Sequence, residues 1–149
     1  MPKRPLDFFS ADLQNSIDLK RLKKFLHPIL HKNHSFILLE GITHYLEMKT
    51  LNTLFELFAN IQLNDSVIAF DFWDPQTKNS PVYQKYITYC EKRFGHKQNN
   101  YNLFDVEFIS HIKGYEIIDL QNIQKFERKY LNTTLLQNYN EILPGNYVV

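Results

Sequence analysis

The chain has 149 residues, of which 44% are apolar and 15% aromatic, so it can build a hydrophobic core and is not expected to be disordered. The 17 basic and 16 acidic residues leave a net charge of +1 without long blocks of one sign, and this does not indicate nucleic acid binding. The single cysteine, Cys90, excludes an internal disulfide and a multi-thiolate zinc site, which favours the reducing cytoplasm.

No sorting or membrane segment is predicted. Residues 1–7 are basic and contain proline, but no apolar run of signal-peptide or membrane-spanning length follows them. We therefore expect no membrane insertion. The four glycines are widely scattered and no internal repeat appears, so residues 1–149 are expected to form a single α/β domain.

The first elements are a helix and a buried strand. Apolar residues recur at helical spacing from Leu19 to Leu30, and Pro28 predicts a kink or an early stop. The run from Phe36 to Leu39 is entirely apolar. Such a run is typical of a strand buried on both faces, in the centre of a parallel sheet.

A strand, helix, strand unit follows. Leu51, Leu54, Phe55 and Phe58 predict an amphipathic helix, and the run 67–72 is a second strand after a turn. The connection is long enough for the crossover that parallel strands require.

The later elements continue the alternation. The predicted order is a helix from Pro81 through Cys90, a loop at 96–100, a helix from Leu103 to Lys113, a strand from Tyr115 to Leu120, a helix from Ile123 to Leu131 and a short strand from Tyr147 to Val149. The whole predicts a mostly parallel sheet flanked by helices.

One segment carries a family signature. Glu40-Gly41 ends the first strand and Tyr45-Leu46 follows after three residues. The landmarks that accompany it in order are Asp12-Leu13, the strand 66–72, Arg93-Phe94-Gly95, the stretch 114–119 and Tyr130-Leu131. Over residues 6–131 this series resembles the leucine carboxyl methyltransferase-like family of class I S-adenosylmethionine-dependent methyltransferases.

The resemblance implies a Rossmann-like fold and methyl transfer to a carboxylate or hydroxyl oxygen of a small molecule. It places Asp12 and Leu13 beside the adenine of S-adenosylmethionine. It places Glu40, with Gly41, near the methionine moiety. Tyr45 would orient the acceptor by alignment rather than by acid–base chemistry.

Two further residues are candidates for the acceptor side, His44 beside Tyr45 and Arg93 as a partner for an anionic substrate. Each candidate also has a structural interpretation. Asp12 suits a helix cap, Glu40 the positive end of the helix that follows, Tyr45 a core position, and Arg93 a helix C-terminus.

Other polar residues are better explained structurally. Asp71 and Asp74 flank Trp73 after the second predicted strand, where turn-forming acids beside a core aromatic are expected. His27, His31 and His34 lack a cysteine partner, and Pro28 interrupts their helix, so no metal site is predicted. Cys90 suits an apolar helix position.

The chain departs from the family in one respect. No G-x-G pattern is present, and Asp12 stands near the start of the sequence, so the glycine loop and the ribose-binding acid that precede this landmark in relatives are absent. We therefore expect the C-terminal portion of a methyltransferase, truncated or split, whose first strand becomes an open apolar edge. A partner chain or a homo-oligomer would cover that edge.

Two alternatives remain open. In the first, the chain has lost catalysis and is a non-catalytic interaction module or a relic of a methyltransferase. In the second, it is an unrelated α/β domain. The last alternative predicts that parallel strands at Phe36 and Val67 are missing.

Overall fold

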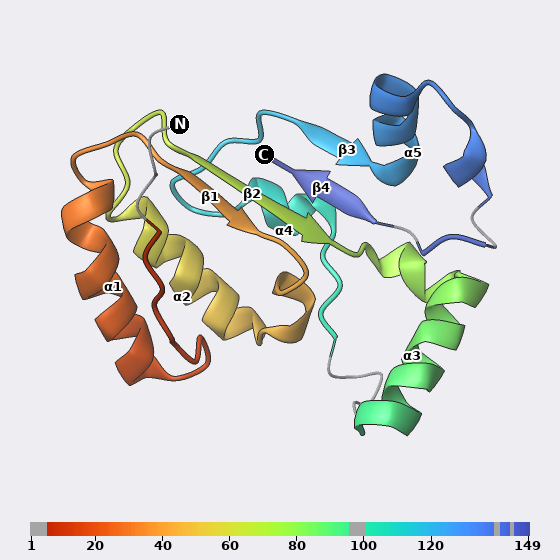
Figure 1. The fold of residues 1–149 in the computed structure, drawn as a ribbon, viewed down its shortest axis with the longest axis horizontal. Helices are drawn as coiled ribbons and strands as arrows, with labels where there is room; N and C mark the ends of the chain where they lie inside the picture. The colour runs from red at the N-terminus through yellow and green to blue at the C-terminus, as the bar shows by residue number, and fades with distance from the viewer. Residues whose placement is uncertain (1–5, 96–100, 139–140, 144) are drawn as a thin grey trace.

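The computed structural model describes residues 6–95, 101–138, 141–143 and 145–149 (Figure 1). The predicted loop at 96–100 lies outside these residues. A four-stranded sheet in the order β1-β2-β4-β3 organises the chain. Its strands are β1 (Phe36–Leu39), β2 (Val67–Phe72), β3 (Leu120–Asn122) and β4 (Asn146–Val148).

The principal helices are α1 (Ser16–Leu30), α2 (Met48–Ala59), α3 (Pro81–Phe94), α4 (Val106–Ser110) and α5 (Ile123–Phe126). The prediction of an α/β fold with helices flanking a sheet is confirmed.

Strands β1 and β2 are parallel, as predicted, and Phe36 lies opposite Val67 in their register. Helix α2 makes the connection between them, and Asp65 forms the turn before β2 with a φ of 63°. The amide of Val67 donates to the carbonyl of Ser35 at 2.8 Å. The alternative of an unrelated domain without these parallel strands is therefore not supported.

Strand β4 is antiparallel to both of its neighbours. It pairs antiparallel with β2 and with β3, so β1, β2 and β3 share one direction and β4 is inserted between the last two. The sequence predicted the short terminal strand but not its direction. Three residues of β4 join β3 to the rest of the sheet.

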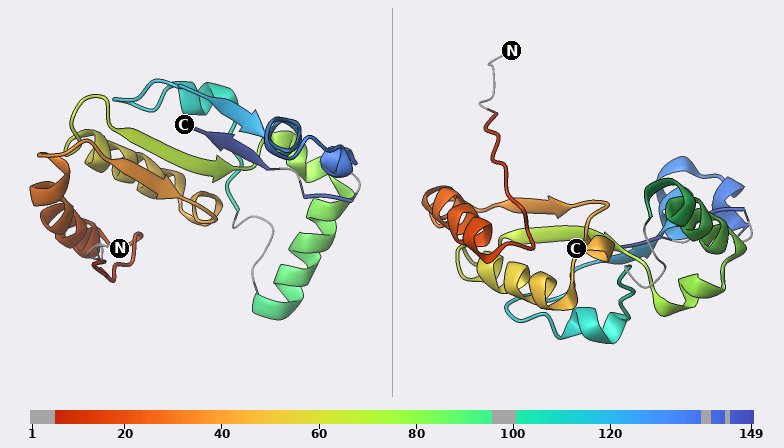
Figure 2. Two further views of the ribbon diagram at one scale, coloured as in Figure 1. Left: turned by 45° about the horizontal axis from the view of Figure 1, so that its top comes forward. Right: turned by 90° about the horizontal axis from the view of Figure 1, so that it is seen from below.

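One face of the sheet is covered by helices. Figure 2 shows α1, α2 and α4 on the same side of β1 and β2. The side chains of α2 fill this layer, with Leu51 and Leu54 fully buried and Phe55 2% exposed. Each such side chain contributes about 1.5–3 kcal/mol by leaving water. The main core therefore lies between this face and the helices.

Helix α1 differs from its prediction only at Pro28, which neither stops nor shortens it. The side chain of Asn15 accepts from the amide of Ile17 and caps the start. Proline lacks one amide donor, but the hydrogen bond from the amide of His31 to the carbonyl of His27 closes the last turn.

On the opposite face of β1 the side chains are largely exposed, as far as the described residues show. Phe36 is 65% exposed and Leu38 56%, while the alternate residue Ile37 packs against the main core. The prediction that this strand is buried on both faces is thus wrong for this chain, because no described layer covers its second face. The strand lies at the sheet edge, which confirms the open apolar edge.

The segment before α1 is not a strand. Residues 6–15, which include the stretch similar to a family strand ending in Asp12-Leu13, have no strand assigned to them. Phe9 instead stacks on Phe25 of α1 with ring centroids 4.8 Å apart. The segment folds back on α1 and does not join the sheet.

A second apolar cluster lies beside the sheet. Helix α3 begins as predicted at Pro81, after the side chain of Ser80 caps it, and ends at Gly95 with a φ of 70°. The buried members of this second cluster are Trp73, Tyr83, Ile87, Cys90 and Tyr101. Cys90 is 4% exposed, as expected for an apolar helix residue.

The region after residue 102 departs most from prediction. The helix expected over Leu103–Lys113 is confined to α4, which Asp105 caps. The strand expected over Tyr115–Leu120 begins only at Leu120, because β4 reaches no further along this side of the sheet. The expected helix over Ile123–Leu131 is present as α5 continuing into η4 (Glu127–Leu131).

A buried carboxylate organises the turn after η4. Glu127 is 1% exposed and accepts hydrogen bonds from the hydroxyl of Thr133, the amide of Leu136 and the side chain of Gln137. Burial acts to raise the pKa of Glu127, but these donors outweigh it and the pKa is lowered. The ionised carboxylate therefore fixes the 127–137 segment.

Candidate functional site

The carboxyl ends of β1 and β2 hold the central candidate residues. Glu40 and Gly41 follow β1 directly, and Gly41 has a φ of 68°, a conformation that favours glycine. The chain then turns into η1 (Thr43–Tyr45), which presents His44 and Tyr45. In open α/β sheets this end of the strands is where ligands bind.

Asp71 ties this turn to the neighbouring strand. Its carboxylate Oδ1 accepts from the amide of Gly41 at 2.7 Å, and its carbonyl accepts from the hydroxyl of Thr43 at 2.5 Å. Two atoms of one residue thus fix the backbone that carries Glu40. Asp71 was expected to be a turn-forming acid, but its carboxylate bonds across the sheet.

Glu40 itself is exposed, and the side chains of Asp71 and Tyr147 belong to the same end of the sheet. Asp71 lies opposite Tyr147 in the β2 and β4 register. Burial raises the pKa of the Tyr147 phenol, and the negative charges of Asp71 and Glu40 raise it further. The carboxylates of Asp71 and Glu40, beside the neutral phenol of Tyr147, therefore give this end of the sheet a negative potential.

Tyr45 belongs to a cluster of aromatic side chains. His44 stacks on Trp73 with ring centroids 4.2 Å apart, and Tyr45 lies 4.2 Å from His44 and 5.3 Å from Tyr101. The hydroxyl groups of Tyr45 and Tyr86 are 3.1 Å apart. Burial, followed by the hydrogen bond with Tyr45, raises the pKa of Tyr86, so the Tyr86 phenol is neutral near pH 7.

His44 is not available to an acceptor. Its side chain is buried, and Nδ1 has no hydrogen-bond partner among the described residues. Burial lowers the pKa of His44, and the nearby charge of Asp71 opposes this only in part. The predicted substrate contact of His44 stays a prediction that this packing does not favour, because the ring lies as a neutral group against Trp73 and Tyr45.

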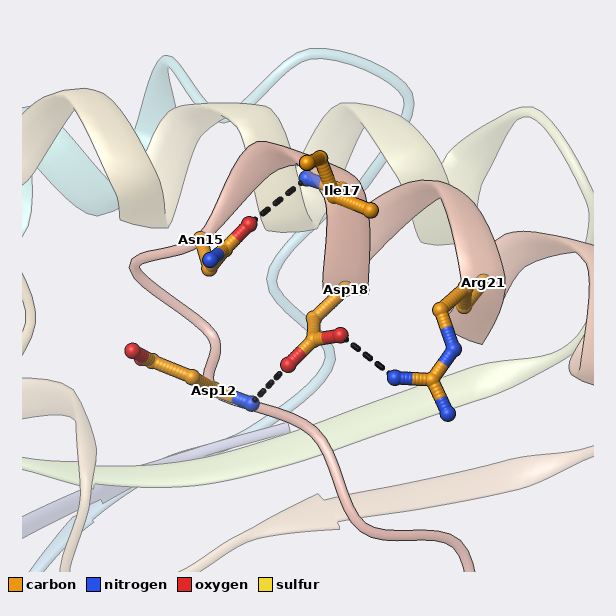
Figure 3. A network of polar contacts seen from close by, with 5 residues as sticks. All are labelled: Asp12, Asn15, Ile17, Asp18 and Arg21. Atoms are coloured by element: carbon orange, nitrogen blue, oxygen red, sulfur yellow. Dashed lines mark hydrogen bonds and ion pairs between the residues drawn. The ribbon is translucent and has the colours of Figure 1, made fainter.

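Asp12 lies at the start of α1, where a network of polar contacts fixes the chain (Figure 3). Its amide donates to Asp18 at 3.0 Å, its carboxylate accepts from the amide of Gln14 at 2.9 Å, and Asp18 also binds Arg21. The bond from the Asp12 amide, followed by that from Arg21, lowers the pKa of Asp18. Asp12 thus belongs to the turn before α1, and Asn15 rather than Asp12 caps the helix.

The remaining candidates are also separated from Glu40 along the fold. Leu13 is half-buried against the main core. Arg93 is exposed in the last turn of α3, a helix that leads away from the sheet (Figure 1), where a cation stabilises the helix end. The structure brings Glu40, Gly41 and Tyr45 to one strand end and does not bring Asp12 or Arg93 to them by any contact among the described residues.

Two residues of this region carried no predicted role. Tyr147 comes beside Asp71 only because β4 is inserted antiparallel, and Asn146 donates to Asp74 at 3.0 Å for the same reason. Nothing in local spacing links positions more than seventy residues apart, so sequence reasoning had no signal for this arrangement.

Three cavities lie away from the carboxyl ends of β1 and β2. Their volumes are about 220, 300 and 560 Å³, and Glu40 is not among their described lining residues. The smallest lies at the amino end of β2, between Phe55, Ile109 and the stretch 114–118.

The described residues contain no metal-binding cluster and no helix that could span a membrane. No group of three or more histidine, cysteine, aspartate or glutamate side chains is placed to hold a metal ion within residues 6–95, 101–138, 141–143 and 145–149. Over the same ranges, every helix is too short or too polar to cross a bilayer.

Comparison with solved structures gave a likeness in fold. A scan against protein-family models found no match, and a search of the curated proteins found none. A solved structure described as a SAM-dependent methyltransferase from Anabaena variabilis ATCC 29413 is similar with a TM-score of 0.49 and 11% identity. The match covers 93% of this chain and 55% of that chain, so this chain spans about half the length of that methyltransferase.

Proposed function

We propose that this chain supplies part of the active site of an S-adenosylmethionine-dependent O-methyltransferase that acts on a small molecule. The observation that carries the proposal is the strand end at Glu40. There the bond between Gly41 and Asp71 fixes the backbone next to the exposed side chain of Glu40, five residues before Tyr45. The order of family landmarks in the sequence supports the same function.

The described residues suit one side of the cofactor. Glu40 and the nearby Asp71 and Tyr147 form an acidic strand end that would complement the ammonium or sulfonium charge of the methionine moiety. Tyr45, which is 38% exposed, would orient the acceptor oxygen.

The adenine side does not fit the described residues. Asp12 belongs to the turn before α1, and the sequence has no G-x-G loop to approach the cofactor closely. We therefore propose that a partner chain or a second copy completes the site along the open edge of β1. On this proposal residues 1–149 act as one domain in the cytoplasm and are weakly active or inactive alone.

Calorimetry with S-adenosylmethionine tests the function. We expect binding when an amino-terminal methyltransferase half containing the glycine loop is added as a separate polypeptide, and little binding without it. Glu40→Gln should then weaken binding about tenfold or more, since a charge-assisted contact contributes roughly 1.5–3 kcal/mol. Glu47→Gln is the control, because Glu47 is also exposed and makes no capping bond.

A second candidate function is a non-catalytic interaction module. The exposed side chains of Phe36 and Leu38 on an unpaired edge favour it, because such edges accept strands from other chains. If no addition restores cofactor binding while Phe36→Lys abolishes association in sedimentation, this second function replaces the first.

A further inference from the structure

The connection between β3 and β4 is much longer than the pairing of these strands requires. They are antiparallel neighbours, which a loop of about two residues can join, yet residues 123–145 connect them. The amide of Ile123 donates to the carbonyl of Gly145 at 3.1 Å, so the connection leaves and re-enters the sheet at one point. Residues 123–138, which form α5, η4 and η5 (Leu135–Gln137), are called the β3–β4 lobe below.

The β3–β4 lobe has a fixed shape. The buried carboxylate of Glu127 in η4 accepts from the amide of Leu136 and the side chain of Gln137, both at 2.9 Å, and so holds η5 against η4. Phe126 meets the ring of Tyr147 in β4 with centroids 5.0 Å apart, which anchors the lobe to the sheet. Figure 1 shows the lobe beside the end of β3, away from α1 and α2.

Three large apolar side chains of the lobe are exposed. Tyr130 is 64% exposed, Leu131 65% and Leu135 80%. A single exposed apolar side chain is ordinary, but several on one small surface mark an interaction site. Since Glu127 binds together the two turns that carry them, these side chains belong to one preformed surface.

The exposed charges of the lobe have one sign. Lys125, Arg128 and Lys129 are exposed, whereas the only acid in residues 123–138 is Glu127, whose carboxylate is buried and hydrogen-bonded within the lobe. The ammonium of Lys129 lies 5.2 Å from the centroid of the Tyr130 ring, so cationic and apolar groups adjoin. The surface therefore complements a partner that carries both apolar and acidic side chains.

Other classes of partner match this surface less well. Nucleic acid would be attracted by the cations but would leave the exposed leucines without apolar contacts. Recognition of an anionic bilayer takes clusters of about four to eight lysines or arginines, more than the lobe carries. A symmetric contact between two copies of the lobe would bring like charges together.

We propose that the β3–β4 lobe binds an acidic amphipathic segment of another protein. Leucine or phenylalanine side chains of that segment pack on the three exposed apolar side chains, and its carboxylates pair with the three surrounding cations. This surface does not depend on the proposed methyltransferase function.

Fluorescence anisotropy tests the proposal, with fluorescein-labelled acetyl-Glu-Asp-Leu-Leu-Glu-Phe-Leu-Asp-Glu-amide as the probe. We expect saturable binding that is lost when serine replaces the leucines and phenylalanine of the peptide. Leu131→Asp should weaken binding at least about tenfold, because it puts a carboxylate at the centre of the apolar contact. The matched control is Ile17→Asp on α1, since Ile17 is 67% exposed, and it should leave binding unchanged. Absent binding, or equal losses from both variants, would overturn the proposal.

Charge variants and two further measurements identify the occupant. Lys129→Glu should weaken binding several-fold and reduce its salt dependence, while Lys92→Glu, an exposed change of equal charge on α3, should not. The proposal is wrong if sedimentation without peptide shows a dimer that Leu131→Asp dissociates, because the occupant is then a second copy. It is also wrong if vesicles containing phosphatidylserine bind the chain and the peptide does not.

Discussion

The two ends of strand β2 differ in how their polar groups are used. At the carboxyl end, Asp71 is bonded to Gly41 and Thr43, and Asp74 is bonded to Thr77 and Asn146. At the amino end, the hydroxyl of Ser66 accepts from the amide of Ser35, and Ile68 lines a cavity of about 220 Å³.

The comparison shows that the two ends of one strand are used differently. At the carboxyl end, the acids Asp71 and Asp74 hold neighbouring elements together, while the side chain of Glu40 is exposed. At the amino end, apolar side chains such as Phe55, Ile68 and Ile109 line a cavity. That cavity comes from topology rather than from a distinctive residue type.

The largest difference between the two ends should appear when their apolar residues are truncated. Trp73→Ala should lower the free energy of unfolding by about 3–5 kcal/mol, because Trp73 is 6% exposed and contacts the rings of His44, Tyr83, Tyr86 and Tyr101. Val67→Ala at the amino end should cost only about 1 kcal/mol. Urea unfolding measures both, and equal losses would contradict the difference.

Removing the carboxylate that joins β1 to β2 should have the next largest effect. Asp71→Ala leaves the amide of Gly41 without its acceptor and should cost about 1–3 kcal/mol in urea unfolding. Asp71→Asn is the matched control, since its side-chain carbonyl can still accept the bond. The assigned role is wrong if alanine and asparagine cost the same.

A smaller effect should come from the buried imidazole. Because the folded pKa of His44 is below its ordinary value, the unfolded chain binds a proton first as pH falls. Stability should therefore decline below about pH 6.5 until the lowered pKa is reached. His44→Phe keeps the stack on Trp73 and should abolish this decline in thermal melts, while His111→Phe, at an exposed position, should retain it.

The smallest effect on stability should follow Glu40→Gln. The side chain is exposed, so the free energy of unfolding should change by less than about 0.5 kcal/mol. The loss of one negative charge should lower the pKa of Tyr147, which ultraviolet titration against Tyr147→Phe can resolve. A large loss of stability would show that Glu40 is a structural residue like Asp71.

Local patterns in the sequence were sufficient to predict the first half of the fold. The apolar run at β1, the helical spacing in α2 and the Pro81 start of α3 each depend on neighbouring residues, and all three elements are present, although one face of β1 is exposed. The start of β3 at Leu120 was missed, because it depends on how far β4 extends. The direction of β4 was missed for the same reason, since pairing partners distant in sequence leave no local period.

The candidate site was predictable to a lesser degree. The position of Glu40 after β1 followed from strand boundaries, but the bond between the next residue, Gly41, and Asp71 required the β1 and β2 register. The burial of His44 could not be read from its neighbours, because Trp73 and Tyr101 reach it from other elements. Side chains that act through long-range packing are where sequence reasoning was least informative.

The insertion of β4 also bears on the order of folding. Every other described element precedes β4 in the chain, yet β4 lies in the interior of the sheet and links β3 to β2. The pair β1 and β2 can form early, whereas β3 can join only after the latest-synthesised strand has closed a loop of more than seventy residues. Sheet completion should therefore be a late, slow kinetic phase, and a ribosome-bound chain lacking β4 should already protect the amides of β1.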